Sequence, residues 1–464
     1  MRSLHRITTC LALAFTCACA WAGSPSDSGA LDAAFGSGGK VILNAAEANA
    51  AGSNLTATDV AVQSNGKIIV AGYADNVCVL ARLNPNGSLD TSFGGTNSFS
   101  PGFAGYGGCS FTGVAVRADD RIVAVGNQPD GVAIVAQFTA NGLPDYGNFG
   151  SNAAVLLQPT SGDSTNVARV ILESNGTIDV AGTYYANQSG FNSNEFYFAR
   201  IGANGSTVEP FEYLFGSGPN ADDHAQALAI DSQGRYVVVG YHRGPNGNYD
   251  FAAIRILGNL YDVDQTFGSG GETTVDFGDN GDYADAVALT RTGYIALGGQ
   301  ANGQAALAWL DPNGTLLTNN NYTYDTYQFV FGSGGGADTI TKLILDDYDT
   351  KYPQLLAIGS GNQSYASGPG GAAGLMFGIA RLDFPGYSNF TLDTSLYGRG
   401  TEGVYFNIRP SGIGSFLTTN NGRSAVFADG KLVVVGDTLG TDMAITRLAA
   451  FDGIFKNGFD NPSL

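Results

Sequence analysis

One pattern recurs seven times along the chain and constrains its fold more than any other feature. Each copy has an apolar segment, a polar turn and a second apolar run that ends in Gly, as in VAVQSNGKIIVAG at residues 60–72. Short apolar runs on either side of a turn rich in Asn, Asp and Gly predict a β-hairpin. The closing glycines of the seven copies are Gly72, Gly126, Gly182, Gly240, Gly299, Gly359 and Gly436.

Two further segments follow each hairpin and complete a repeating unit. VLARLNPNG at residues 79–87 predicts a third strand, and LDTSFGG at residues 89–95 leads into a fourth. Second strands such as IIVAG at residues 68–72 are apolar at successive positions, so both faces of each sheet need a covering layer. We therefore expect an all-β fold, a seven-bladed β-propeller with about four antiparallel strands per blade. An open β-solenoid is the alternative.

The two ends of the repeat array predict how the ring closes. LDAAFGSGGKVIL at residues 31–43 precedes every hairpin, and the last unit stops after its third strand. We expect the N-terminal strand to complete the last blade as its outer strand, which removes an open sheet edge. The first strand of each hairpin then lies innermost, where space is small. Its central residue is alanine in five units, at Ala61, Ala115, Ala229, Ala288 and Ala425.

Taken together, the motifs resemble a known family. LDxxFGxGG, V-x-x-[ND]-G-[KR]-[IL]-x-V-x-G and ARLNPNGSLD are similar to the delta-60 repeat, a β-propeller family of unknown function. The similarity is closest at residues 81–95 and 428–436, and it is weaker in the middle units, where Gln137 and Trp309 replace the arginine. The resemblance implies a propeller fold and export, and it implies no catalytic residues.

The chain begins with features of a secretory signal. A basic start and an apolar run over residues 7–20 precede small residues and Gly23, and the run is shorter than a membrane span. A lipoprotein signal at Cys17 or Cys19 is the alternative. We expect export to the periplasm, the cell surface or the exterior of a Gram-negative bacterium, and no membrane insertion. The expected segments are a signal peptide (1–22), the propeller (23–450) and a short C-terminal tail (451–464).

Charge narrows the range of partners. The chain has 22 Lys and Arg against 41 Asp and Glu, a formal net charge of −19. A surface this acidic repels nucleic acid and anionic lipid. We therefore expect no nucleic-acid partner, and a protein or a glycan as the ligand.

Outside the expected signal peptide the chain keeps two cysteines, Cys78 and Cys109. In an oxidising compartment an even pair is a candidate disulfide, and two buried free thiols are the alternative.

Motifs for catalysis are sparse. Past the signal peptide the histidines are His224 and His242, and the sequence has neither G-x-S-x-G nor H-E-x-x-H. Asp222, Asp223 and His224 have the residue types of a catalytic fragment, but a polar entry to a strand is the interpretation we favour. We expect no catalytic residues and no cofactor. The rival is a propeller enzyme of glycosidase or lyase type with an axial site, which paired carboxylates at one mouth of the channel would indicate.

Recurring charged residues suggest structural roles. Asp223, Asp282 and Asp338 share one register before an inner strand, which favours a turn-closing acceptor. The third-strand arginines are expected to pair with a repeated aspartate such as Asp90, and the alternative is a ring that binds an anion. These arginines are Arg82, Arg200, Arg255, Arg381 and Arg447.

The acidic loop DFGDNGDYAD at residues 276–285 raises the possibility of calcium, because carboxylate oxygens are its preferred ligands, although the EF-hand spacing is missing. A calcium-stabilised structural surface protein is therefore a further hypothesis.

Loops that differ between units are the candidate contact sites. The aromatic residues of two such loops suit stacking on a glycan or packing on a protein. They are Tyr322, Tyr324, Tyr327, Tyr397 and Tyr405. The sequence thus predicts an exported propeller that acts as a non-catalytic binding or interaction module.

Overall fold

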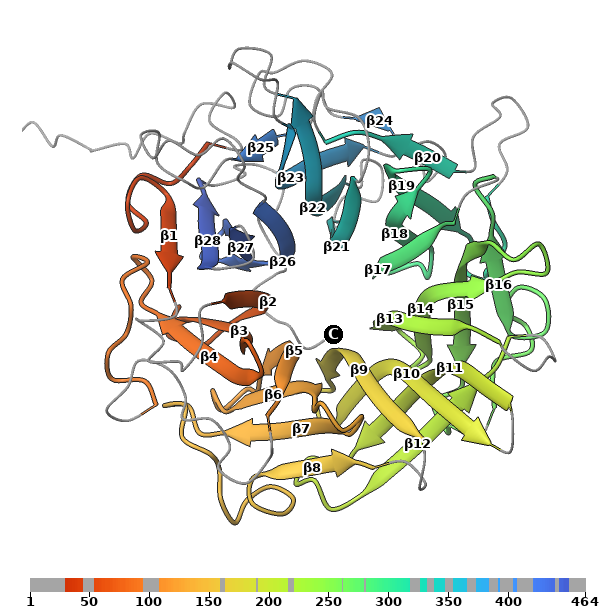
Figure 1. Ribbon diagram of the computed structural model, residues 1–464, viewed down its shortest axis with the longest axis horizontal. Coiled ribbons are helices and arrows are strands. Elements are labelled where there is room, and N and C mark those ends of the chain that lie inside the picture. Colours follow the sequence, from red (N-terminus) through yellow and green to blue (C-terminus); the bar gives the residue numbers. More distant parts are fainter. Residues whose placement is uncertain are drawn as a thin grey trace, which may run out of the picture.

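The computed structural model has seven antiparallel β-sheets arranged like blades around a central axis (Figure 1). It describes residues 30–44, 54–94, 108–158, 163–188, 191–215, 221–260, 262–278, 281–317, 326–331, 338–346, 354–364, 373–383, 391–392, 404–406, 420–438 and 442–449. This confirms the predicted seven-bladed β-propeller. In the described part of the chain, no helix is long and apolar enough to cross a membrane.

The blades follow one another in sequence. Blade 1 comprises β2 (Leu55–Val62), β3 (Ile68–Ala74) and β4 (Val77–Leu83). Blade 2 comprises β5 (Ser110–Val116), β6 (Ile122–Asn127), β7 (Ala133–Phe138) and β8 (Ala154–Leu157). Blade 3 comprises β9 (Ser164–Leu172), β10 (Ile178–Gln188), β11 (Phe191–Ile201) and β12 (Val208–Tyr213). Blade 4 comprises β13 (Asp223–Ile230), β14 (Tyr236–Arg243), β15 (Tyr249–Ile256) and β16 (Glu272–Val275). Blade 5 comprises β17 (Tyr283–Leu289), β18 (Ile295–Ala301), β19 (Gln304–Leu310) and β20 (Thr326–Phe329). Blade 6 comprises β21 (Thr339–Asp346), β22 (Gln354–Ser364), β23 (Ala373–Asp383), β24 (Thr391–Leu392) and β25 (Val404–Phe406).

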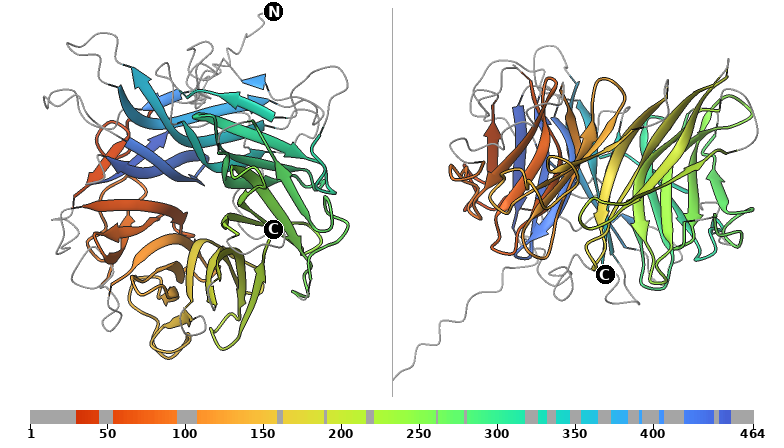
Figure 2. Two further views of the ribbon diagram at one scale, coloured as in Figure 1. Left: turned by 45° about the vertical axis from the view of Figure 1, so that its right-hand side comes forward. Right: turned by 90° about the horizontal axis from the view of Figure 1, so that it is seen from below.

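Blade 7 closes the ring with strands from both ends of the chain. It comprises β26 (Asn420–Ala428), β27 (Lys431–Thr438), β28 (Asp442–Leu448) and the N-terminal strand β1 (Lys40–Leu43). Strand β1 pairs antiparallel with β28, with Val41 opposite Ile445. The inner strand of blade 1 also contacts that of blade 7. The predicted closure is confirmed, and the open solenoid is wrong (Figures 1 and 2).

Each blade is covered on both faces because its second strand alternates between two cores. In β3, Ile68 and Val70 pack into the cluster shared with blade 7, whereas Ile69 and Ala71 pack into the cluster shared with blade 2. All four side chains are fully buried. Seven such clusters lie between the seven pairs of neighbouring blades. Successive apolar residues in these strands therefore reflect the two-sided burial that the sequence predicted.

The recurrent closing glycine is required by a β-bulge. In every blade the pairing of the first two strands shifts by one residue, between Ala57 and Asp59 in blade 1. The bulge brings the inner strand close to its partner, and a Cβ on Gly72 would lie 1.8 Å from the carbonyl oxygen of Thr56. At Gly436 the corresponding distance, to the Asn421 carbonyl, is 1.7 Å. A larger residue cannot occupy this position without moving the strand.

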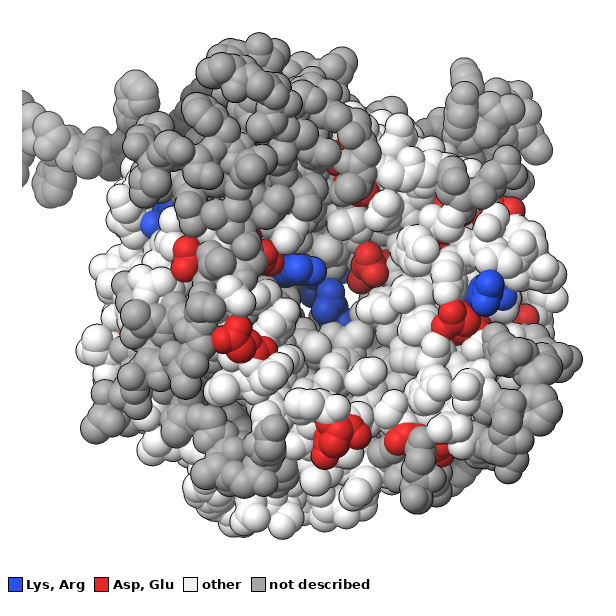
Figure 3. All heavy atoms as spheres, viewed as in Figure 1, with Lys and Arg blue, Asp and Glu red and all other residues white. Residues whose placement is uncertain are grey.

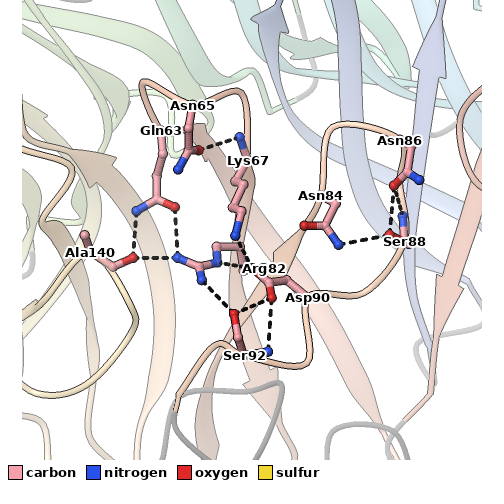
Figure 4. A network of polar contacts seen from close by, with 10 residues as sticks. All are labelled: Gln63, Asn65, Lys67, Arg82, Asn84, Asn86, Ser88, Asp90, Ser92 and Ala140. Carbon is pink, nitrogen blue, oxygen red and sulfur yellow. Dashed lines mark hydrogen bonds and ion pairs between the residues drawn. The ribbon is translucent and has the colours of Figure 1, made fainter.

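The Arg and Asp of the repeat motifs meet in a buried cluster that we call the clamp. In blade 1, Arg82 Nε lies 2.8 Å from Asp90 Oδ2, which also accepts a hydrogen bond from Lys67 Nζ at 2.7 Å (Figure 4). The Arg82 guanidinium lies 4.7 Å from the centroid of the Phe93 ring. Burial would raise the pKa of Asp90, but the hydrogen bonds from Lys67 and Ser92 and the charge of Arg82 hold it far below its usual range.

The clamp also joins one blade to the next. Arg82 Nη1 donates to the carbonyl of Ala140 in blade 2 at 2.7 Å, and Gly94 N donates to Asn141 O at 2.8 Å. Arg255 with Asp264 repeats the arrangement between blades 4 and 5, with Nε to Oδ2 at 3.0 Å. The prediction that the third-strand arginines pair with aspartate is thus confirmed at these positions.

The same clamp closes the ring. Arg447 of β28 lies 2.8 Å from Asp32 Oδ2 through Nε, and its guanidinium covers the Phe35 ring at 4.5 Å. Arg447 also donates to the carbonyl of Pro85 in blade 1. Residues more than 400 positions apart therefore make the contacts that neighbouring motifs make within blade 1.

Cys78 of β4 and Cys109, just before β5, are joined by a disulfide with a Cα–Cα distance of 5.0 Å. Both residues are buried in the cluster between blades 1 and 2. The bond therefore links the third strand of one blade to the entry of the next.

We predict that Arg82→Ala destabilises the protein by about 3 kcal/mol, because it removes the buried counter-ion of the Asp90 carboxylate and the hydrogen bond to the next blade. The matched control is Arg243→Ala, at an exposed arginine, which should change stability by no more than about 0.5 kcal/mol. Urea and thermal unfolding of both variants provide the measurement. Equal effects of the two substitutions would contradict the clamp.

We also predict that dithiothreitol lowers the melting temperature of the wild type. Closing a segment with a sequence separation of 31 stabilises a fold by up to roughly 4 kcal/mol in the chain-entropy model. A Cys78→Ser/Cys109→Ser variant should melt at the lower temperature with or without the reductant. A wild type that is indifferent to dithiothreitol would show that the two sulfurs are not bonded in solution.

Candidate functional site

The seven bulges place one residue each around the central axis. The extra residue of each inner strand lines a cavity of about 600 Å³ at the centre of the ring. These residues are Thr58, Thr112, Ala168, Gln226, Asp285, Thr341 and Arg423. A cavity of this size suits a small ligand.

The three threonines of this ring have a structural role. Thr58 Oγ1 donates to the carbonyl of Phe111 in blade 2 at 2.9 Å, and Thr112 Oγ1 donates to that of Val167 in blade 3 at 2.8 Å. Thr341 repeats the contact between blades 6 and 7, at 3.0 Å from the Gly422 carbonyl. Their hydroxyls join successive inner strands, which leaves the other four positions to define the chemistry of the cavity.

Basic side chains gather at the centre of this acidic protein. Arg169 and Arg423 line the cavity, and Figure 3 shows Lys and Arg atoms in the central hollow of one face. Lys342 lies one residue beyond the bulge of β21, at the register position that Arg169 occupies in β9, and the two charges act on each other. Burial lowers the pKa of Lys342. The charge of Asp59 raises this pKa, and the charge of Arg169 lowers it. The proximity of these cations favours an anion in the cavity.

Asp285 is the carboxylate among the described residues that line the cavity. Burial raises its pKa to about 6, although the charges of Arg169 and Arg423 and a hydrogen bond from Thr339 act in the opposite direction. The group therefore changes charge slightly below neutral pH. The paired carboxylates that would have indicated a glycosidase do not occur among these described lining residues.

Polar and aromatic groups complete the lining. The amides of Asn127, Asn166 and Asn194 and the phenol of Tyr185 face the cavity. Asn127 is held by hydrogen bonds in both directions with the backbone of Val167, at 2.7 and 3.0 Å. Amides in fixed positions beside an aromatic ring suit a hydroxyl-rich ligand.

His224 stands at the edge of the cavity in a polar network. Its Nε2 lies 2.8 Å from Asp222 Oδ1, and its ring stacks on Tyr241 with centroids 4.8 Å apart. The adjacent Asp223 points elsewhere: it accepts hydrogen bonds from Phe215 N at 2.9 Å and from His242 Nδ1 at 2.6 Å. The structure therefore separates the three residues of the Asp-Asp-His sequence into two sets.

The register of Asp223, Asp282 and Asp338 is explained by the turn before each inner strand. In each case Oδ2 accepts a hydrogen bond from the backbone of an aromatic residue, at 2.9, 2.7 and 2.7 Å. Those aromatic residues are Phe215, Phe277 and Phe331. The prediction of a turn-closing acceptor is confirmed at all three.

The predicted contact loops lie largely outside the described residues, as Tyr322, Tyr324 and Tyr397 do. Tyr327 lies in the outer strand β20, half-buried, with its ring 5.8 Å from that of Phe329. Tyr405 lies in β25, paired with Gly378. Of the five tyrosines, Tyr327 and Tyr405 are thus placed on outer strands, and the role of all five in binding stays a prediction.

The sequence predicted an axial site only under the rival enzyme hypothesis, and none of the residues at the seven bulges was recognised as lining it. A signal was present: in each of the first five blades the bulged residue stands fourteen positions before the closing Gly, as Thr58 does before Gly72. When the five units are aligned on this glycine, the bulged residue is Thr, Thr, Ala, Gln and Asp in turn. The residue type therefore varies at a position whose spacing is constant.

Comparisons with known proteins support the fold. A family model described as "Domain of unknown function (DUF5122) beta-propeller" matches residues 63–93, the segment that carries Lys67, Arg82, Asp90 and Phe93 of the clamp. No curated protein matches the sequence.

Two solved structures of virginiamycin B lyase from Staphylococcus aureus are similar in shape. A selenomethionine-substituted form is 10% identical over 88% of this chain and 98% of that chain, with a TM-score of 0.45. A catalytically inactive variant with quinupristin is also 10% identical, over 88% of this chain and 99% of that chain, again with a TM-score of 0.45. At this similarity we carry over neither an activity nor a ligand.

Proposed function

We propose that this protein is an exported, non-catalytic binding module of the delta-60 repeat type, and that its axial cavity takes an acidic glycan. The observation that supports the ligand class is the pair of guanidinium groups, Arg169 and Arg423, in a polar cavity at the centre of a chain with a formal net charge of −19. Export is supported by the signal-like N-terminus and by the disulfide, which is typical of oxidising compartments.

Each part of the ligand has a counterpart in the lining. A sugar carboxylate accepts hydrogen bonds from planar guanidinium groups, which Arg169 and Arg423 supply. Sugar hydroxyls pair with the amide of Asn166, and a sugar ring stacks on Tyr185. The cavity volume accommodates a short oligosaccharide end.

Calorimetric titration with trigalacturonic acid, against neutral galactotriose as the matched ligand, tests this function. We expect the acidic trisaccharide to bind and the neutral one to bind at least tenfold more weakly, about 1.4 kcal/mol. Arg169→Gln should abolish the preference, whereas Arg243→Gln, at an exposed arginine, should retain it. Equal affinity for both sugars, or no binding of either, would refute the assignment.

The binding should also depend on pH through Asp285. Below about pH 6 this carboxyl is protonated, so the repulsion between it and a bound carboxylate disappears. We predict that affinity for trigalacturonic acid rises roughly fivefold between pH 7 and pH 5, about 1 kcal/mol for one charge at a partly solvated site. Asp285→Asn should bind as tightly at pH 7 as the wild type does at pH 5. An unchanged pH profile in Asp285→Asn would contradict this role.

A further inference from the structure

Three carboxylates meet at the junction between blades 4 and 5, away from the cavity-lining residues. Asp250 belongs to the start of β15, Asp276 follows β16, and Asp282 immediately precedes β17. One oxygen from each lies within 4.8 Å of the others. Asp276 is exposed, Asp250 is half-buried and Asp282 is fully buried.

The buried member of the cluster has an oxygen with no donor. Asp282 Oδ2 accepts a hydrogen bond from Phe277 N at 2.7 Å, but Oδ1 has no hydrogen-bond partner in the described part of the chain. Asp250 Oδ1 is also buried, and it too has no partner there. An unpaired buried carboxylate oxygen is unfavourable unless a cation, a donor or a proton compensates it.

In blade 4 the residue equivalent to Asp282 is Asp223, and both of its carboxylate oxygens have hydrogen-bond donors. There Asp223 Oδ2 accepts the hydrogen bond from Phe215 N in the turn, and Oδ1 accepts a hydrogen bond from His242 Nδ1 at 2.6 Å. By register, Ala301 of blade 5 stands where blade 4 has His242, so the donor is missing. The groups close to Asp282 are instead the carboxylates of Asp250 and Asp276, which add negative charge and do not neutralise it.

We propose that Asp250, Asp276 and Asp282 bind a divalent cation, calcium in preference to magnesium. An all-carboxylate set suits a hard cation, and calcium–oxygen distances of 2.3–2.6 Å allow two ligand oxygens to stand up to about 4.8 Å apart. Magnesium, with oxygens at about 2.1 Å, requires a tighter group. Backbone carbonyls and water would supply the remaining ligands, and the ion would join blade 4 to blade 5. The site does not depend on the proposed glycan function.

The test is a calcium titration of the full chain after treatment with EDTA and dialysis. We expect one calcium ion per chain by calorimetry, and a rise of several degrees in melting temperature at millimolar calcium that EGTA reverses. Magnesium should give a smaller shift. Asp276→Asn keeps an oxygen for the hydrogen bond from Gly278 N and should weaken calcium binding at least tenfold. Asp130→Asn, at an exposed aspartate of blade 2, should leave calcium binding unchanged.

Two results would overturn the proposal. One is a wild type that shows no saturable binding of calcium, magnesium or manganese up to millimolar concentration. The other is an Asp276→Asn protein that binds calcium as tightly as Asp130→Asn, which would place the ion elsewhere. Neither result bears on trigalacturonic acid binding, so failure here and failure of the glycan assignment are separate outcomes.

Discussion

At three blade junctions, including the one that closes the ring, a buried arginine contacts an aspartate, a phenylalanine ring and a carbonyl of the next blade. No blade has a core of its own, because the second strand of each alternates its side chains between two neighbours. Apolar packing brings the sheets face to face but does not fix how they slide or rotate. The clamp of Arg82, Asp90 and Phe93, which also reaches Ala140, fixes that relation with directional contacts.

The repeated blade structure allows the bulged residue of each inner strand to differ from blade to blade. The bulge occurs in all seven inner strands, and the glycine opposite it preserves the close approach of the two strands. Threonine at three bulges bonds one inner strand to the next, whereas Gln226, Asp285 and Arg423 bring different chemistry to the same place. A repeated scaffold thus surrounds an asymmetric cavity lined by two arginines and one aspartate within an acidic protein.

Repetition made the fold predictable from sequence, and its local departures made the sites hard to predict. Hairpins, closure and Arg–Asp pairing follow from patterns that recur, such as Arg82 with Asp90. The cavity does not, because the bulge that turns Asp285 toward the axis depends on strand register. The acidic cluster was only half visible: Asp276 and Asp282 lie in one loop, but Asp250 comes from another strand, and the absence of a donor opposite Asp282 appears only once blade 5 is aligned with blade 4.

The most direct test of ring closure is a double-mutant cycle between Asp32 and Arg447, which are 415 positions apart and 2.8 Å from each other. Stability is measured for Asp32→Asn, Arg447→Ala and the double variant, beside the same cycle for Asp90 and Arg82. A closed ring predicts a coupling energy of about 1–3 kcal/mol for both pairs. A normal coupling for Asp90 with Arg82 and none for Asp32 with Arg447 would mean that the two ends of the chain do not meet.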